Sequence, residues 1–166
     1  MNSNHKIEIG HFYKVECFDK NGKLKWEDGF ENLVVTAGRN KYLDATLKTG
    51  LTTPLWYVGL KDAVAPVAAD TMASHAGWAT LTPYSNATDP AYTPGTIAAG
   101  SVDNSASKAV FNINGTATIG GAFLKDNSTK GGATGILLGA GEFGAARGVI
   151  SGDTLNVTVT CSITST

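Results

Sequence analysis

One stretch of the chain matches a motif that binds nucleotides in other proteins. Residues 139–144 read GAGEFG, which fits the GxGxxG fingerprint. That fingerprint works only where its last glycine packs a helix against a parallel sheet and the phosphate sits at the helix N-terminus. Residues 145–148 (AARG) cannot start a durable helix. We therefore interpret the motif as a glycine-rich loop and expect no cofactor.

Two further groups of side chains have the right chemistry but unfavourable spacing. Asp70, Ser74 and His75 supply the residue types of a hydrolase triad, yet Ser74 and His75 are neighbours on one predicted helical turn, so their side chains diverge. No G-x-S-x-G elbow is present. His5, His11 and His75 could bind a metal only if folding gathered them with a carboxylate. We predict no catalytic or metal site and expect the protein not to be an enzyme.

Aromatic side chains offer a different chemistry, because exposed rings on a β-sheet can stack on sugars. Trp26 and Trp56 lie in predicted strands with apolar neighbours, which favours a place in the core. Tyr84 and Tyr92 flank or lie in residues 86–100, a proline-containing stretch predicted to be a long loop. These two tyrosines are therefore the better candidates for surface contacts. A carbohydrate-binding or adhesin module remains open and requires both to be exposed together.

Bulk composition excludes several classes of partner. The 166 residues suit a single domain, and the net charge of −1 provides no field to attract nucleic acid or an anionic membrane. Residues 1–10 lack the apolar stretch of a signal peptide, and no apolar run is long enough for a membrane span. Cys17 and Cys161 fall on apolar faces of predicted strands, and no CxxC spacing indicates zinc. We expect both to be buried free thiols.

Residues 32–50 predict a strand end followed by the chain's one helix. Thr36 is the expected N-cap and Gly50 the expected stop. Leu43 and Leu47 lie four residues apart and predict an apolar, buried helix face.

The remainder of the chain predicts short strands. Alternating apolar residues predict strands at 12–18 and 154–163, and Asn21-Gly22 predicts a tight turn into a return strand at 23–28. Asn114-Gly115 predicts a second hairpin, with a bulge at Gly120-Gly121 in its return strand. Further strands are expected at 55–60, 78–84, 108–113, 116–124, 135–138 and 147–150. The fold class is mainly β: an antiparallel β-sandwich, jelly-roll- or immunoglobulin-like, with one short α-helix near residues 37–48. We expect residues 1–9 to form an N-terminal arm, or else an edge strand, and residues 10–166 a single β-sandwich domain.

Five segments, in this order, carry a family resemblance. They are residues 15–26 (VECFDKNGKLKW), 32–38 (NLVVTAG), 56–60 (WYVGL), 70–78 (DTMASHAGW) and 151–155 (SGDTL). Together they resemble small virion structural proteins of tailed bacteriophages and prophages.

The resemblance implies a non-enzymatic particle component, with a capsid decoration or cement protein favoured over a tail component. Its partners would be the major capsid protein and copies of itself, on the capsid surface of a virion assembled from protein made in the host bacterial cytoplasm. His5, Lys6 and Ile7 of the arm, together with Tyr84 and Tyr92, are the residues we expect at the partner contact. A tail role and the adhesin module stay open as alternatives.

Overall fold

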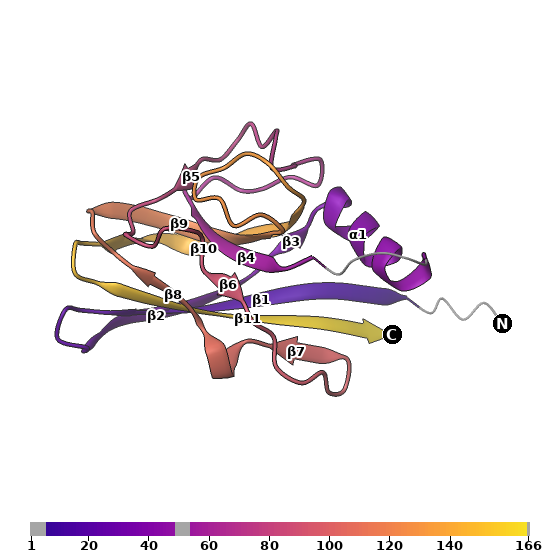
Figure 1. The fold of residues 1–166 in the computed structure, drawn as a ribbon, viewed down its shortest axis with the longest axis horizontal. Helices are drawn as coiled ribbons and strands as arrows, with labels where there is room; N and C mark the ends of the chain where they lie inside the picture. The colour runs from indigo at the N-terminus through magenta and orange to yellow at the C-terminus, as the bar shows by residue number, and fades with distance from the viewer. Residues whose placement is uncertain (1–5, 49–53, 166) are drawn as a thin grey trace.

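Two antiparallel β-sheets pack face to face in the computed structural model, which describes residues 6–48 and 54–165 (Figure 1). One α-helix lies among the described residues, so the predicted β-sandwich with a single helix is confirmed. The first sheet has the order β2 (Leu24–Glu31), β1 (Ile7–Phe18), β11 (Thr154–Ser165) and β7 (Ser101–Asp103), and β8 (Ala109–Asn112) also pairs with β11. The second has the order β3 (Leu33–Val34), β10 (Leu137–Val149), β9 (Ala117–Lys125), β4 (Trp56–Lys61) and β5 (Thr80–Leu81), and β6 (Ala91–Tyr92) pairs with β4. Helix α1 (Thr36–Leu47) follows β3, and a 3-10 turn (Ser105–Ser107) precedes β8.

The central pair of the first sheet is β1 with β11, the two strands that show the clearest alternation. They pair along their whole length, from Ile7 opposite Ser165 to Phe18 opposite Thr154. The predicted hairpin from β1 to β2 is confirmed, and Gly22 takes the positive φ of +77° that the turn requires. Residues 7–9 are paired with β11 and belong to the sheet, so this part of residues 1–9 is an edge strand and not a separate arm.

The glycines of residues 139–144 lie in strand β10, so their interpretation as a loop is wrong. Gly139 and Gly141 make room where the chain crosses from β2 in the first sheet to β3 in the second. A Cβ on Gly139 would lie 2.8 Å from the backbone oxygen of Leu33, and one on Gly141 would lie 2.8 Å from that of Glu31. Any larger residue would push the crossing chain away from β10.

The second predicted hairpin is also wrong. Strand β8 pairs with β11 in the first sheet, whereas β9 pairs with β10 and β4 in the second. Asn114-Gly115 therefore carries the chain between sheets, with the Asn114 N–H donating to the carbonyl of Pro83. A register irregularity does occur at Gly120, but the extra residues, 143–146, lie on β10 between Glu142 and Arg147 and not in the strand predicted to bulge.

Helix α1 packs through Ala37, Gly38 and Tyr42 rather than through its leucines. Gly38 is buried, and a Cβ there would lie 1.9 Å from the backbone oxygen of Leu138 on β10. Leu43 and Leu47 are 57% and 78% exposed, so the prediction that they form a buried face is wrong. The N-cap is Val35 and makes no side-chain capping bond, so Thr36 is not the cap. The expected stop at Gly50 lies outside the described residues.

The main core fills the space between the sheets. Inward side chains of β1 and β11, such as Val15 and Val157, meet Val58, Leu60 and Leu124 from the second sheet. A smaller cluster lies on the outer side of the second sheet and contains Val35, Met72, Trp78, Phe123, Leu137 and Ala140. Strand β9 is therefore buried on both faces over most of its length.

Candidate interaction site

An apolar cavity opens at the end of the sandwich where α1 sits. Its volume is about 440 Å³, and its walls come from α1, the start of β4, the segment around β6 and β7, and the end of β11. Helix α1 and the end of β11 lie on the right of Figure 1. The lining includes Tyr42, Trp56, Tyr92, Leu124, Leu138 and Ile163. A cavity of this size and lining suits an apolar group of a partner or ligand.

The rim of this cavity carries exposed apolar side chains. Ile97 and Ile163 line it and are 74% and 46% exposed. Leu55, which is 73% exposed, follows the lining residue Pro54. We call these exposed apolar side chains the apolar rim (Leu55, Ile97 and Ile163). Exposed apolar side chains around an open cavity are typical of interaction sites in soluble proteins.

A buried polar network lies beside the cavity. The Asn32 amide Nδ2 donates to His11 Nδ1 at 2.9 Å, which leaves His11 Nε2 to donate to the Tyr42 hydroxyl at 2.7 Å. Burial lowers the pKa of His11 to about 4, so the ring is neutral at physiological pH.

Cys161 continues this network toward β6. The Tyr92 hydroxyl donates to Cys161 Sγ at 3.7 Å. Burial raises the pKa of the Cys161 thiol and therefore disfavours the reactive thiolate. These uncharged groups hold the wall of the cavity in place through hydrogen bonds.

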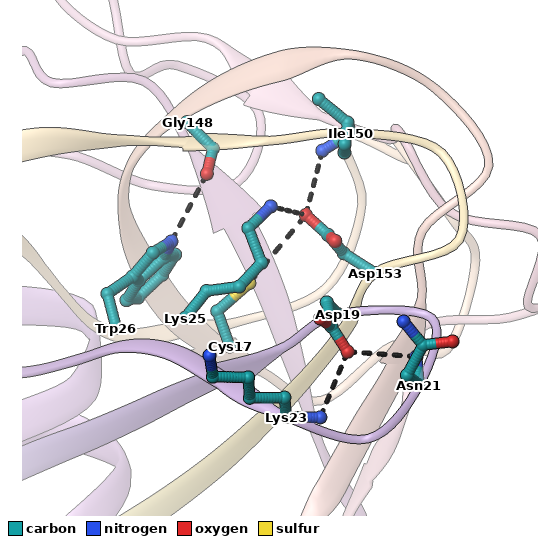
Figure 2. A network of polar contacts seen from close by, with 9 residues as sticks. All are labelled: Cys17, Asp19, Asn21, Lys23, Lys25, Trp26, Gly148, Ile150 and Asp153. Carbon is teal, nitrogen blue, oxygen red and sulfur yellow. Dashed lines mark hydrogen bonds and ion pairs between the residues drawn. The ribbon is translucent and has the colours of Figure 1, made fainter.

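A second network ties the start of β2 to the turn before β11, at the other end of β1 (Figure 2). The buried carboxylate of Asp153 accepts from Lys25 Nζ at 2.5 Å and from the Ile150 N–H at 2.9 Å. Cys17 Sγ lies 3.8 Å from the same oxygen. Burial, with a further contribution from Asp153, raises the pKa of Cys17 to about 11, so this thiol is also protonated. Cys17 and Cys161 are both free, as predicted; Cys17 is buried and Cys161 half-buried.

The side chains considered for a triad instead hold a surface loop together. Asp70 Oδ2 accepts from Trp78 Nε1 at 2.9 Å and from the Val67 N–H at 2.8 Å. The ring of His75 stacks on Trp78, and its Nδ1 lies 2.8 Å from the Trp78 carbonyl oxygen. No hydrogen bond joins Ser74 to His75 or His75 to Asp70 in the described part of the chain. Across residues 6–48 and 54–165, no three His, Cys, Asp or Glu side chains gather where they could hold one metal ion.

The predicted partner-contact residues divide into two groups. Lys6 is exposed, and Ile7 is 71% exposed at the start of β1, while His5 lies outside the described residues. Tyr84 and Tyr92 are only 1% and 8% exposed, so the prediction that they form a surface pair is wrong. Tyr84 packs edge-on against Phe111, and Tyr92 lines the apolar cavity.

Sequence reasoning missed a buried ion pair beneath the loop that carries Tyr84. Lys125 Nζ lies 2.8 Å from Asp89 Oδ2, and neither side chain is exposed. The Tyr84 hydroxyl donates to the other oxygen of Asp89. The available signal was the lysine that ends the apolar run of β9, one residue beyond the strand predicted at 116–124.

None of the helices in the described residues is both long and apolar enough to cross a membrane. Comparison with models of known protein families finds no match to this chain, and comparison with curated protein sequences finds none either.

Proposed function

We propose that this protein is a non-enzymatic structural component of a tailed-phage virion, and that it decorates the capsid by binding the lattice of the major capsid protein. The proposal starts from the resemblance of five sequence segments to small virion proteins. The observation that carries it on the molecule is the apolar rim around an open cavity at one end of the sandwich. Such a surface is suited to burial against another protein.

The charges of the chain fit a role in binding rather than in catalysis. Ion pairs such as Lys25–Asp153 and Lys125–Asp89 join separate segments of the fold. The two thiols are held protonated, and His11 is held neutral. A cement protein needs a stable domain with a binding surface at one end. The symmetry of the shell repeats that surface many times, so weak contacts add up to stable binding.

The test is to localise the protein in purified particles from a host that carries its gene. Antibody labelling in electron micrographs should decorate the heads, and deleting the gene should lower the temperature at which the capsids release DNA. Labelling of tails alone would show that the protein is a tail component and not a capsid decoration protein. Absence from purified virions would refute both.

A matched pair of variants connects the location to the apolar rim. Ile97→Asp places a charge on a 74% exposed rim residue and should abolish binding to capsids that lack the protein. Val67→Asp places the same charge on a 57% exposed side chain away from the cavity and should bind normally. Equal binding by the two variants would show that the rim is not the contact surface.

A further inference from the structure

The start of β1 is an open strand edge. Strand β1 pairs with β11 from Ile7 onward, but with β2 only from Phe12 onward. The Asn32 N–H donates to the His11 carbonyl at 3.0 Å, so the backbone polar groups of His11 point toward the β2 side. The N–H and C=O groups of successive residues in an antiparallel strand point to alternate sides. The backbone groups of Ile7 and Ile9 therefore also point toward the β2 side. No strand in the described part of the chain pairs with Ile7 or Ile9 on that side.

A groove of about 580 Å³ runs along this edge. One wall is the stretch from Lys6 to Phe12, and Leu33 and Arg39 contribute to the other. The groove exists because β2 ends at Glu31 and the chain crosses to the second sheet at Leu33. An open edge with an exposed isoleucine is a template for another strand.

We propose that the edge binds a second copy of this chain, with the two β1 strands antiparallel and Ile7 opposite the partner's Ile7. The two isoleucines would exchange both backbone hydrogen bonds across a two-fold axis. Lys6 would then lie opposite the partner's Glu8, and Glu8 opposite the partner's Lys6. Lys6 Nζ and Glu8 Oε1 are 2.8 Å apart within one chain, so both side chains are on the same face and available to this four-charge cluster.

Charge and free backbone groups select this register over its neighbours. Shifting one strand by two residues, which is one step of the hydrogen-bond pattern, pairs Ile7 with the partner's Ile9. It also places Glu8 opposite the partner's Glu8, and these two negative charges repel each other. The next step puts Ile7 opposite the partner's His11, whose carbonyl already accepts from Asn32. The pairing uses only the fold and does not depend on the virion role proposed above.

This interface is small, so we expect a concentration-dependent dimer rather than a permanent one. Copies held side by side on a surface would pair more completely, because the second contact becomes intramolecular.

Charge reversal tests the register in sedimentation experiments on the purified protein. Lys6→Glu or Glu8→Lys alone puts like charges opposite each other twice and should weaken dimerisation by about tenfold or more. The double variant should restore it, and an equimolar mixture of the two single variants should form heterodimers. Lys14→Glu is the matched control, because Lys14 is also an exposed β1 lysine beside glutamates but lies where β2 covers the edge. Its dimerisation should equal that of the wild type.

Cross-linking tests the contact directly. Directly opposite hydrogen-bonded residues have Cα atoms about 5.5 Å apart, within the range that a disulfide spans. Ile7→Cys should therefore give a disulfide-linked dimer under mild oxidation, whereas Val67→Cys, similarly exposed, should not. Equal cross-linking of the two variants, a wild type that stays monomeric at every concentration, or a double charge swap that fails to restore pairing would each overturn the proposal.

Discussion

Mild acid should destabilise this fold through His11. Burial lowers the pKa of His11 to about 4, whereas an imidazole in an unfolded chain titrates near about 6.5. Between these values the unfolded state binds a proton that the folded state does not. Stability is therefore complete above the unfolded pKa and is lost as the pH falls toward the folded pKa.

The size of the loss follows from the two pKa values. Each pH unit inside the window costs up to about 1.4 kcal/mol. Allowing for partial titration at its ends, lowering the pH from about 6.5 to about 4.5 should remove about 2 kcal/mol of unfolding free energy. The contacts give the physical reason: a second ring proton on Nδ1 would face the Asn32 amide N–H in place of the lone pair that now accepts it.

The assay is urea unfolding followed by tryptophan fluorescence across this pH range. Carboxyls whose folded pKa is lowered by ion pairs, such as Glu16 and Asp28, add to the loss of stability at the acid end of this range, as the pH nears their unfolded pKa. The contribution of His11 is therefore the difference between the wild type and His11→Gln, which should be less stable at neutral pH and should have a shallower slope. His75→Gln is the control and should keep the wild-type slope, since it leaves His11 in place. A wild-type stability that does not change with pH, or the same slope in His11→Gln, would refute the reasoning.

Three further predictions concern the packing of the fold, and each is measured as a change in unfolding free energy. Leu43→Ala and Leu47→Ala should each cost less than about 0.5 kcal/mol, because both side chains are exposed; a loss of several kcal/mol would restore the buried helix face. Asp153→Asn should cost about 1.5–3 kcal/mol through its weakened bonds to Lys25 and Ile150, and an unchanged midpoint would count against that network. Tyr84→Phe should also cost about 1.5–3 kcal/mol, because it removes the hydroxyl that donates to a buried carboxylate; a neutral effect would mean that Asp89 is satisfied without it.

Local patterns predicted the parts of the fold that local chemistry determines. The alternation in β1 and β11 and the Asn-Gly turn after β1 were sufficient to place the central hairpin and the C-terminal strand. The helix was placed within one residue, at Thr36–Leu47, but its packing face was not predicted. Leucine spacing indicates where an apolar stripe lies, whereas the close approach of Gly38 to β10 depends on a strand about 100 residues later in the chain.

Long-range pairing explains the remaining differences. An Asn-Gly turn reverses the chain in the same way whether the next strand joins its own sheet or the opposite one, so the crossing at Asn114 could not be read locally. Tyr84 and Tyr92 flank a stretch without periodicity, yet that stretch folds back on the sandwich and buries both rings. The apolar cavity is lined by segments from six parts of the chain, and no single stretch of sequence indicates it.

The pairing of β1 with β11 also sets how the molecule responds to force. Ile7 lies opposite Ser165, so the start of one strand and the end of the other are neighbours. A pull that separates these two points loads the backbone hydrogen bonds one pair after another, because they run across the strands. The same pull applied between Phe18 and Ser165, at opposite ends of the pair, loads all of the bonds together in shear. The sandwich is therefore mechanically anisotropic. A low force applied between Ile7 and Ser165 should separate β1 from β11, whereas a force along the strands should need to be much higher.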